Sequence, residues 1–260
     1  MNQPLQKQDI FSILSSNQTK GKLTRLLPPG TRMDRFLQIC FNEIRANPKL
    51  LTCRPESIVD AIGQTARLGL DIGGSLGHAF LVPYGQECQF LIGYKGLKEL
   101  AYRTGKVLSI EARTVYENDF FEIEYGTNAH MIHRPTLIDQ GRSIAYSAMA
   151  TLENGTKVYG VLTKNDIERI KKSARNSSSP NSPWVTHEDE MSKKTAVRAI
   201  CKMLPQFSNN DLLQEAISLD EKGEIGLQNN SQVFESTAEE YIPDEPKSQP
   251  QEIAAMLGGR

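Results

Sequence analysis

The chain has 260 residues, of which 38% are hydrophobic, so it can hold one large domain or two small ones with part of the chain outside a core. Its net charge of −1 hides an asymmetry, because residues 1–219 hold 27 Lys and Arg against 22 Asp and Glu, whereas residues 220–260 hold 3 against 9. A basic body with an acidic tail is typical of a protein that binds a polyanion, although acidic tails also serve solubility alone.

The four cysteines are scattered along the chain without C-x-x-C spacing. This pattern argues against a zinc site and indicates free thiols in a reducing compartment. No apolar run approaches the length of a membrane span, and no signal peptide precedes the first polar residues. We therefore expect a soluble, cytoplasmic protein that makes no use of a membrane.

Residues 1–30 are polar, lack periodicity and end in Pro-Pro-Gly, which predicts a mobile N-terminal arm with at most one short helix near Ile10–Leu14. Two helices follow, one to about Ala46 and one from Pro55 to about Gly69, and we expect them to support a sheet. The glycine-rich loop at 73–77 lacks the Lys-Ser/Thr ending of a P-loop, which favours a plain turn over a phosphate cradle. An ATP-driven motor is not expected.

Residues 79–125 are the stretch around which the rest of the chain is arranged. Two apolar runs in 79–93 flank a Gly-containing turn and predict a hairpin, and a helix follows from Lys95 to Gly105. Its apolar positions lie on one side, which leaves Lys95, Lys98 and Tyr102 facing outward. A second pair of strands is predicted over 107–125.

The segment after Tyr125 reads as irregular, and its His130-x-x-His133 spacing suits either half a metal site or, as we favour, two surface histidines. Asn154-Gly155 predicts a hairpin between strands at 143–152 and 157–162. The helix that begins after Thr163 is expected to expose its cations, which are Lys164, Lys171, Lys172 and Arg175.

The helix that begins after Thr186 carries Lys194, Arg198 and Lys202 at every fourth position, opposite an apolar face. At about 1.5 Å of rise per residue these cations recur about every 6 Å, a spacing that suits successive phosphates of one strand. We found no acidic partner for them in the pattern, although an ordinary solvated face is the alternative. A short final helix over 211–219 precedes a tail that is predicted to be disordered, with a small apolar cluster at Ile253–Leu257.

No catalytic signature was found in the sequence. A nuclease needs clustered carboxylates for metal ions, and the carboxylates here lie on predicted strands or in the tail. No G-x-S-x-G elbow is present. We therefore expect a binding protein rather than an enzyme, with no cofactor and no metal.

Several runs resemble the RecT family of phage and prophage recombinases, which anneal complementary single strands and are distantly related to Red-beta. The resemblance covers roughly residues 24–221, and its motifs keep the family's order. The runs that carry it are Phe90–Ala101, Ser109–Arg113, Val115–Asp119, Ser182–Thr186, Glu190–Thr195 and Ala216–Glu221.

The resemblance implies an α+β fold with a β-β-β-α single-strand-annealing core and added helices, in subunits that form rings or helical filaments on DNA. It implies ATP-independent annealing of single-stranded DNA in homologous recombination; the alternatives are a metal-dependent nuclease and a passive single-strand binder. We divide the chain into an arm (1–30), an annealing and oligomerisation core (31–219) and an acidic flexible tail (220–260). The tail is the expected docking segment for a partner exonuclease or a host single-strand binding protein.

The predicted DNA-binding residues combine cations from four segments of the core with one hydroxyl. They are Lys95, Lys98, Arg103, Lys106, Arg113, Lys171, Lys172, Arg175, Lys193, Lys194, Thr195, Arg198 and Lys202. Three aromatic residues are candidates for stacking on bases, although core or rim positions are as plausible for each: Tyr94, Tyr102 and Trp184.

Overall fold

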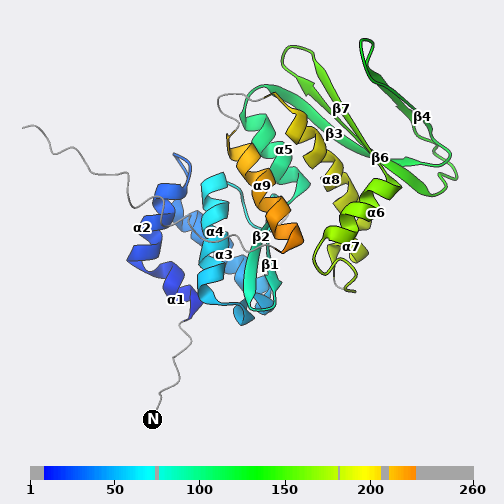
Figure 1. Ribbon diagram of the computed structural model, residues 1–260. Coiled ribbons are helices and arrows are strands. Elements are labelled where there is room, and N and C mark those ends of the chain that lie inside the picture. The colour runs from blue at the N-terminus through cyan, green and yellow to red at the C-terminus, as the bar shows by residue number, and fades with distance from the viewer. Residues whose placement is uncertain (1–8, 74–75, 181, 206–210, 227–260) are drawn as a thin grey trace, which may run out of the picture.

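Two groups of elements flank a central layer of helices (Figure 1). The structure, a computed structural model, describes residues 9–73, 76–180, 182–205 and 211–226. The N-terminal helices and the first hairpin form one group, and the remaining strands form the other. The described part combines helices with sheets that are all antiparallel, so the predicted α+β class is confirmed.

The first described residues form two helices rather than a mobile arm. These are α1 (Ile10–Ser15) and α2 (Asn17–Leu26). The side chains of Asp9 and Ser16 cap them by accepting hydrogen bonds from backbone N–H groups. Leu14 and Leu23 are completely buried, and both helices contact α4. The predicted arm is therefore wrong for this stretch, because its apolar residues are packed; residues 1–8 lie outside the described residues.

The two helices predicted for residues 31–69 are confirmed, with a short 3-10 helix between them. Their bounds are α3 (Met33–Ala46), η1 (Pro48–Thr52) and α4 (Pro55–Leu68). Pro55 occupies the first turn of α4, where its missing N–H costs nothing. Gly69 ends the helix in the left-handed region at φ 61°, which glycine adopts without a steric penalty.

The hairpin and helix predicted for residues 79–105 are also confirmed. β1 (Ala79–Tyr84) pairs with β2 (Glu87–Ile92), with Leu81 opposite Phe90. α5 (Tyr94–Arg103) follows at once. The N–H of Gly93 donates to the carbonyl of His78 at 2.8 Å, so the first turn of α5 is held against the beginning of β1.

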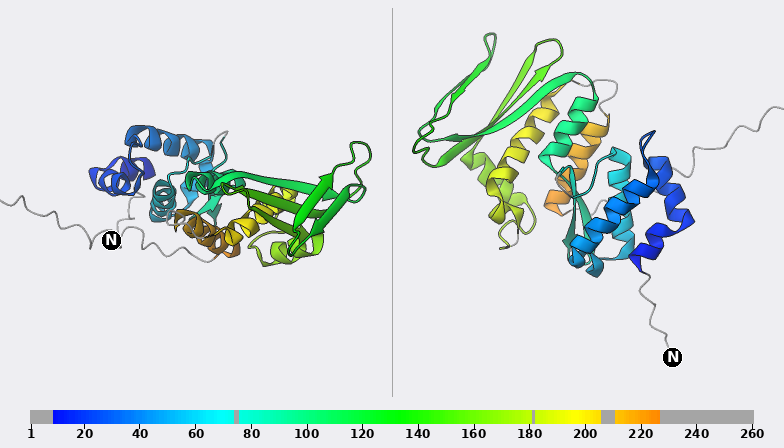
Figure 2. Two further views of the ribbon diagram at one scale, coloured as in Figure 1. Left: turned by 90° about the horizontal axis from the view of Figure 1, so that it is seen from above. Right: turned by 180° about the vertical axis from the view of Figure 1, so that it is seen from behind.

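The larger sheet has three antiparallel strands with β6 in the middle. They are β3 (Val107–Tyr116), β6 (Ser143–Leu152) and β7 (Lys157–Thr163), which confirms the hairpin predicted around Asn154. α8 (Glu188–Met203) packs on all three strands, and it lies with the helix that follows β7 on one face of this sheet (Figure 2). β7 leads directly into α6 (Lys164–Ser173). This order is compatible with a β-β-β-α core, which stays a prediction.

The strand after β3 does not pair with it. β4 (Phe120–Glu124) pairs with β5 (His130–Arg134) as a separate two-stranded sheet. Both strands predicted in 107–125 are present, but they do not pair with each other, and the segment predicted to be irregular at His130 is instead strand β5. The reason is that β6 pairs with β3 along most of its length, with Ala112 opposite Ala148.

The last described helix extends beyond the end predicted for it. α9 (Asp211–Ile225) continues past Leu219, and its residues Asp220 and Glu224 are buried. The predicted boundary between core and disordered tail at residue 220 is therefore wrong for residues 220–226. Charged residues occupy this stretch because they have buried partners on α8, as shown below. In the described part of the chain, no helix is long and apolar enough to span a membrane.

Candidate nucleic-acid interface

A cleft of about 610 Å³ lies between the β1–β2 hairpin, the first turn of α5 and the region of α7 (Pro183–Thr186) and α8. Five of the predicted DNA-binding or stacking residues line it, although they come from segments about 100 residues apart. They are Tyr94, Lys95, Arg175, Trp184 and Lys194. The fold thus brings together residues that the sequence could only group by type.

Lys95 reaches this cleft from the first turn of α5, and its side chain is exposed. The turn is fixed because Gly96 packs against the backbone of His78 and Gly93 donates to the same carbonyl. Within the described residues Lys95 has no ion-pair partner. Its ammonium group is therefore available to an anionic ligand.

Arg175 reaches the cleft from the segment after α6 and is oriented by two contacts. Its backbone N–H donates to the carbonyl of Glu224 at 2.8 Å. Its guanidinium lies 5.8 Å from the centre of the Tyr84 ring. This cation–π contact holds the guanidinium in place while its charge stays at the surface. Arg175 is exposed and has no carboxylate partner among the described residues, so it can contact a phosphate or stack on a base.

The three candidate stacking residues have different surroundings. Trp184 is only 3% exposed, so its ring lies within the wall of the cleft and offers no free face to a base. Tyr102 lies on α5 outside the cleft residues, and its hydroxyl accepts a hydrogen bond from the N–H of Ile110 at 3.0 Å. Tyr94 is half-buried and lines the cleft. Of the three, Tyr94 is therefore the one placed to meet a base.

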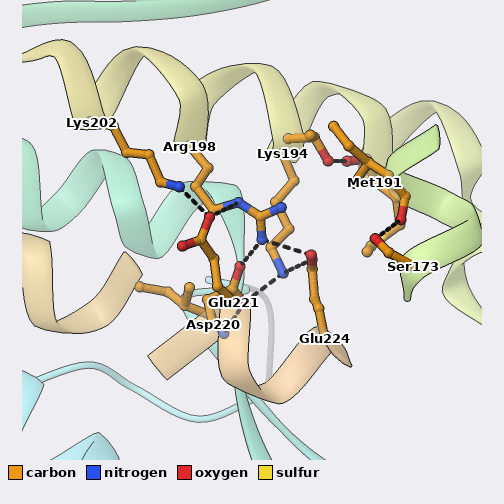
Figure 3. Close-up of polar contacts among 11 residues, drawn as sticks. Ser173, Met191, Lys194, Arg198, Lys202, Asp220, Glu221 and Glu224 are labelled. Atoms are coloured by element: carbon orange, nitrogen blue, oxygen red, sulfur yellow. Dashed lines mark hydrogen bonds and ion pairs between the residues drawn. The ribbon is translucent and has the colours of Figure 1, made fainter. Parts of the chain in front are cut away.

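Lys194 and Arg198 do not face solvent. They are 5% and 6% exposed and meet the carboxylates of α9 (Figure 3). Lys194 Nζ lies 2.7 Å from Asp220 Oδ1 and 3.1 Å from Glu224 Oε1. Arg198 Nη1 lies 2.7 Å from Asp220 Oδ2 and 2.7 Å from Glu224 Oε2. We call these four residues the buried charge cluster.

The buried charge cluster corrects the prediction of a cationic face without acidic partners. Two cations and two carboxylates balance each other, and Asp220 also accepts a hydrogen bond from the N–H of Ile92 at 3.3 Å. The cluster therefore ties α8, α9 and β2 together. Breaking such a pair leaves an uncompensated buried charge, which is strongly destabilising. Lys194 and Arg198 therefore stabilise the packing of α8 against α9, and they do not form a row of free charges.

The ionisation of the cluster follows from its burial and its charges. Burial raises the pKa of the Asp220 carboxyl above its ordinary value, against the pull of Lys194 and Arg198. Burial also opposes ionisation of Glu224, but the charges of Lys194 and Arg198 hold its pKa below the ordinary value. The pKa of Lys194 is raised, because Asp220 and Glu224 outweigh the burial that disfavours its charge.

Comparisons with known proteins identify the family of this chain. The model of the RecT family matches residues 34–235 of the chain. The chain belongs to the RecT family. "Protein RecT" of Escherichia coli (strain K12) is 37% identical over 222 residues, which cover 82% of this chain and 81% of that relative. "Uncharacterized protein YqaK" of Bacillus subtilis (strain 168) is 28% identical over 250 residues, which cover 95% of this chain and 84% of that relative. Membership supports a DNA-binding protein of recombination and strand annealing.

Most of the other predicted cations of this RecT-family chain are already paired. Arg103 donates to the carbonyls of Leu68 and Gly69, so it joins α5 to the end of α4. Thr195 is buried and donates to the carbonyl of Met191. The remaining ion pairs are Lys106 with Glu153, Arg113 with Glu111, Lys171 with Glu188, Lys193 with Asp189 and Glu190, and Lys202 with Glu221.

Two further predicted cations of the RecT-family chain have no ion pair in the described part. Lys98 is half-buried on α5, and Lys172 is exposed near the end of α6. Neither lines the cleft. The structure therefore does not gather the predicted set into one groove. It brings Lys95 and Arg175 to the cleft as free charges and leaves the others paired or elsewhere on the surface.

Sequence reasoning missed the acidic half of the buried charge cluster. Asp220 and Glu224 are four residues apart on α9, and Lys194 and Arg198 are four residues apart on α8. This matched spacing was a usable signal, because residues four apart share one helix face. The polar, acidic composition of residues 220–260 hides this match, because it places Asp220 in the predicted tail.

The two histidines of the RecT-family chain that were considered as half a metal site each meet a carboxylate. His133 Nε2 lies 2.9 Å from Asp119 Oδ2, and His130 Nε2 lies 3.3 Å from Glu122 Oε1. Asp119 also accepts hydrogen bonds from the N–H groups of Tyr116 and Thr136. These contacts fix the turn between β3 and β4 to the segment that follows β5.

Proposed function

We propose that this protein binds single-stranded DNA in the cleft and anneals complementary strands in homologous recombination, without nucleotide hydrolysis. The observation that carries the assignment of the cleft is the convergence of Lys95, Arg175 and Tyr94, two free cations and an aromatic ring from distant segments. Family membership supplies the recombination context. The protein acts by binding rather than by bond-making chemistry.

The electrostatics of the cleft support binding through the sugar–phosphate backbone. Three carboxylates line it beside the cations: Glu43, Glu190 and Glu224. Glu224 belongs to the buried charge cluster, and Glu190 pairs with Lys193 at 2.6 Å. Burial raises the pKa of Glu43 above its ordinary value. Among the described residues, the cations without an ion-pair partner at the cleft are Lys95 and Arg175, and the carboxyl group of Glu43 lies beside them.

The proposed mechanism needs no chemical step. Cations neutralise phosphates and release counterions, so binding is insensitive to sequence. Tyr94 supplies a ring on which one base can stack. Subunits assembled as a ring or filament hold the strand extended with its bases presented. A complementary strand then pairs, and base stacking drives the reaction once repulsion between the strands is lowered.

An annealing assay tests this proposal against its two alternatives. Complementary oligonucleotides with a fluorophore and a quencher are mixed with the full-length protein, without nucleotide and with EDTA. We expect faster annealing than without protein, and intact strands on a denaturing gel after Mg²⁺ is added. Binding without acceleration would indicate a passive single-strand binder. Cleavage in Mg²⁺ would indicate a nuclease, and a need for ATP would exclude the mechanism.

A further inference from the structure

The cleft is lined by apolar side chains as well as by cations, and contacts with a phosphate backbone do not need these apolar side chains. Phe80, Leu81 and Val82 of β1 line it, together with Leu91 and Met191. Phe80 is 41% exposed, a high value for a large apolar side chain at a concave site. Concave apolar surface of this kind is typical of a site that accepts apolar side chains.

The C-terminal segment of the chain starts at the rim of this cleft. Glu224 lines the cleft, and the carbonyl of Gly226 accepts a hydrogen bond from Arg175 Nη1 at 3.5 Å. Residues 227–260, a segment of 34 residues outside the described part, therefore begin beside Arg175. A random coil as long as the stretch from residue 227 to residue 253 would have an average end-to-end distance of about 30 Å. Such a tether keeps residue 253 within reach of the cleft at a local concentration in the millimolar range.

The tail is complementary to the cleft in both apolar character and charge. Ile253, Met256 and Leu257 stand at i, i+3 and i+4, a spacing that places three apolar side chains on one face of a helical turn. Residues 227–260 hold six carboxylates against two cations, and all six carboxylates lie before Ile253. The free cations at the cleft are Lys95 and Arg175. An apolar anchor preceded by acidic residues matches an apolar cleft with a cationic rim.

We infer that the protein's own tail docks in the cleft, with Ile253–Leu257 against the β1 side and the acidic residues near Lys95 and Arg175. The occupant is in the same chain, because the tail begins at the rim and its tether favours an intrachain contact. The docking is inferred from the geometry alone. A consequence of it, that the tail and single-stranded DNA cannot occupy the cleft together, rests on the proposed function. DNA that fills the cleft then releases the tail, which makes it available to a protein partner only on DNA.

A photo-crosslinker tests the docking in the full-length chain. p-Benzoylphenylalanine replaces Leu257, and the protein is irradiated at low concentration and low salt and analysed by mass spectrometry. We expect crosslinks to residues 80–82 and to Met191, in a species that migrates as a single chain. The same probe in a chain with Ile253→Ser and Met256→Ser is the matched control and should lose them. Crosslinks elsewhere, or only between two chains, overturn the inference.

Competition with DNA separates this inference from the proposed function. Oligothymidine should suppress the crosslink over the same concentrations at which it binds. The full-length Ile253→Ser, Met256→Ser, Leu257→Ser variant should bind oligothymidine roughly three- to tenfold more tightly at low salt, since the competing state is removed. If saturating DNA leaves the crosslink to the cleft unchanged, the tail docks there as inferred, but DNA binds at another site. If the protein binds DNA normally but shows no crosslink, the docking inference is wrong and the proposed function is unaffected.

Discussion

Gly96 shows how one residue positions a cation of the cleft. A Cβ at this position would overlap the carbonyl oxygen of His78 and lie 2.8 Å from Ile92 Cγ1. We therefore expect Gly96→Ala to destabilise the protein by about 1–3 kcal/mol through overpacking, although alanine favours helix by about 1 kcal/mol. Gly21→Ala is the matched control, because Gly21 lies inside α2 with open space around it, and it should stabilise. Urea unfolding followed by circular dichroism distinguishes the two, and equal effects would contradict the steric argument.

Asp220 is the residue on which the buried charge cluster depends. Asp220→Ala leaves Lys194 and Arg198 with one carboxylate for two buried cations, so we expect a loss of about 3–5 kcal/mol in the free energy of unfolding. Glu221→Gln on the same helix removes an exposed pair with Lys202 and should cost at most about 1 kcal/mol. Urea unfolding measures both variants. A small effect at Asp220 would show that the cluster is hydrated or rearranges.

At the scale of elements, α9 belongs to the folded body although the composition of its last turns resembles the tail. A chain that ends at Leu219 loses Asp220 and Glu224, whereas a chain that ends at Gly226 keeps the whole buried charge cluster. We expect the first to be insoluble or at least about 3–5 kcal/mol less stable, and the second to unfold like the parent. Thermal unfolding of the two truncations is the measurement. Equal melting temperatures would place residues 220–226 outside the cooperative unit.

The junction between β3, β4 and the segment after β5 should depend on pH. Burial disfavours the charged form of Asp119, but hydrogen bonds from His133, Tyr116 and Thr136 hold its pKa below the ordinary value. A carboxyl with a lowered pKa in the folded state stabilises above its unfolded pKa, about 3.9, and loses that contribution as pH falls through the folded value. We expect amide exchange at Thr136 to accelerate below about pH 4, relative to amides in α4.

Asp119→Asn is the test of that assignment. Asparagine keeps the shape of the side chain and one acceptor oxygen but has no acidic titration, so the ratio of exchange at Thr136 to exchange in α4 should no longer change below about pH 4. If the variant keeps the acid-dependent step of the parent, another group is responsible for it.

At the scale of the whole molecule, the salt dependence of DNA binding reports how many phosphates the cleft neutralises. Lys95→Gln with Arg175→Gln should lower the log–log salt slope by roughly 1.4, at about 0.7 for each phosphate contact on a single strand. At about 1 kcal/mol for each contact the affinity falls roughly 30-fold. Lys157→Gln with Arg169→Gln is the charge-matched control, since both residues are exposed outside the cleft. Fluorescence anisotropy between low and high salt measures all three proteins; equal slopes would place the DNA elsewhere.

Local elements and family membership were predictable from the sequence. Apolar periodicity and turn residues predicted the β1–β2 hairpin, α5 and the β6–β7 hairpin, because these depend on neighbours within a few residues. The family follows instead from the resemblance of whole runs, such as Phe90–Ala101, to the RecT family. Local pattern also predicted that Lys194 and Arg198 share a helix face, and this is correct.

Only the tertiary structure decided what those residues face. Whether Lys194 meets solvent or Asp220 depends on the docking of α9, and whether β3 pairs with β4 or β6 depends on which strand reaches it. Lys95 and Arg175 are 80 positions apart in the sequence, and they share a cleft only because α5 and the end of α6 pack around the β1–β2 hairpin. Such contacts cannot be predicted from a local sequence pattern, because they join residues that are far apart in the chain. The same row of cations is a binding surface when it is exposed and a structural ion cluster when it is buried against carboxylates.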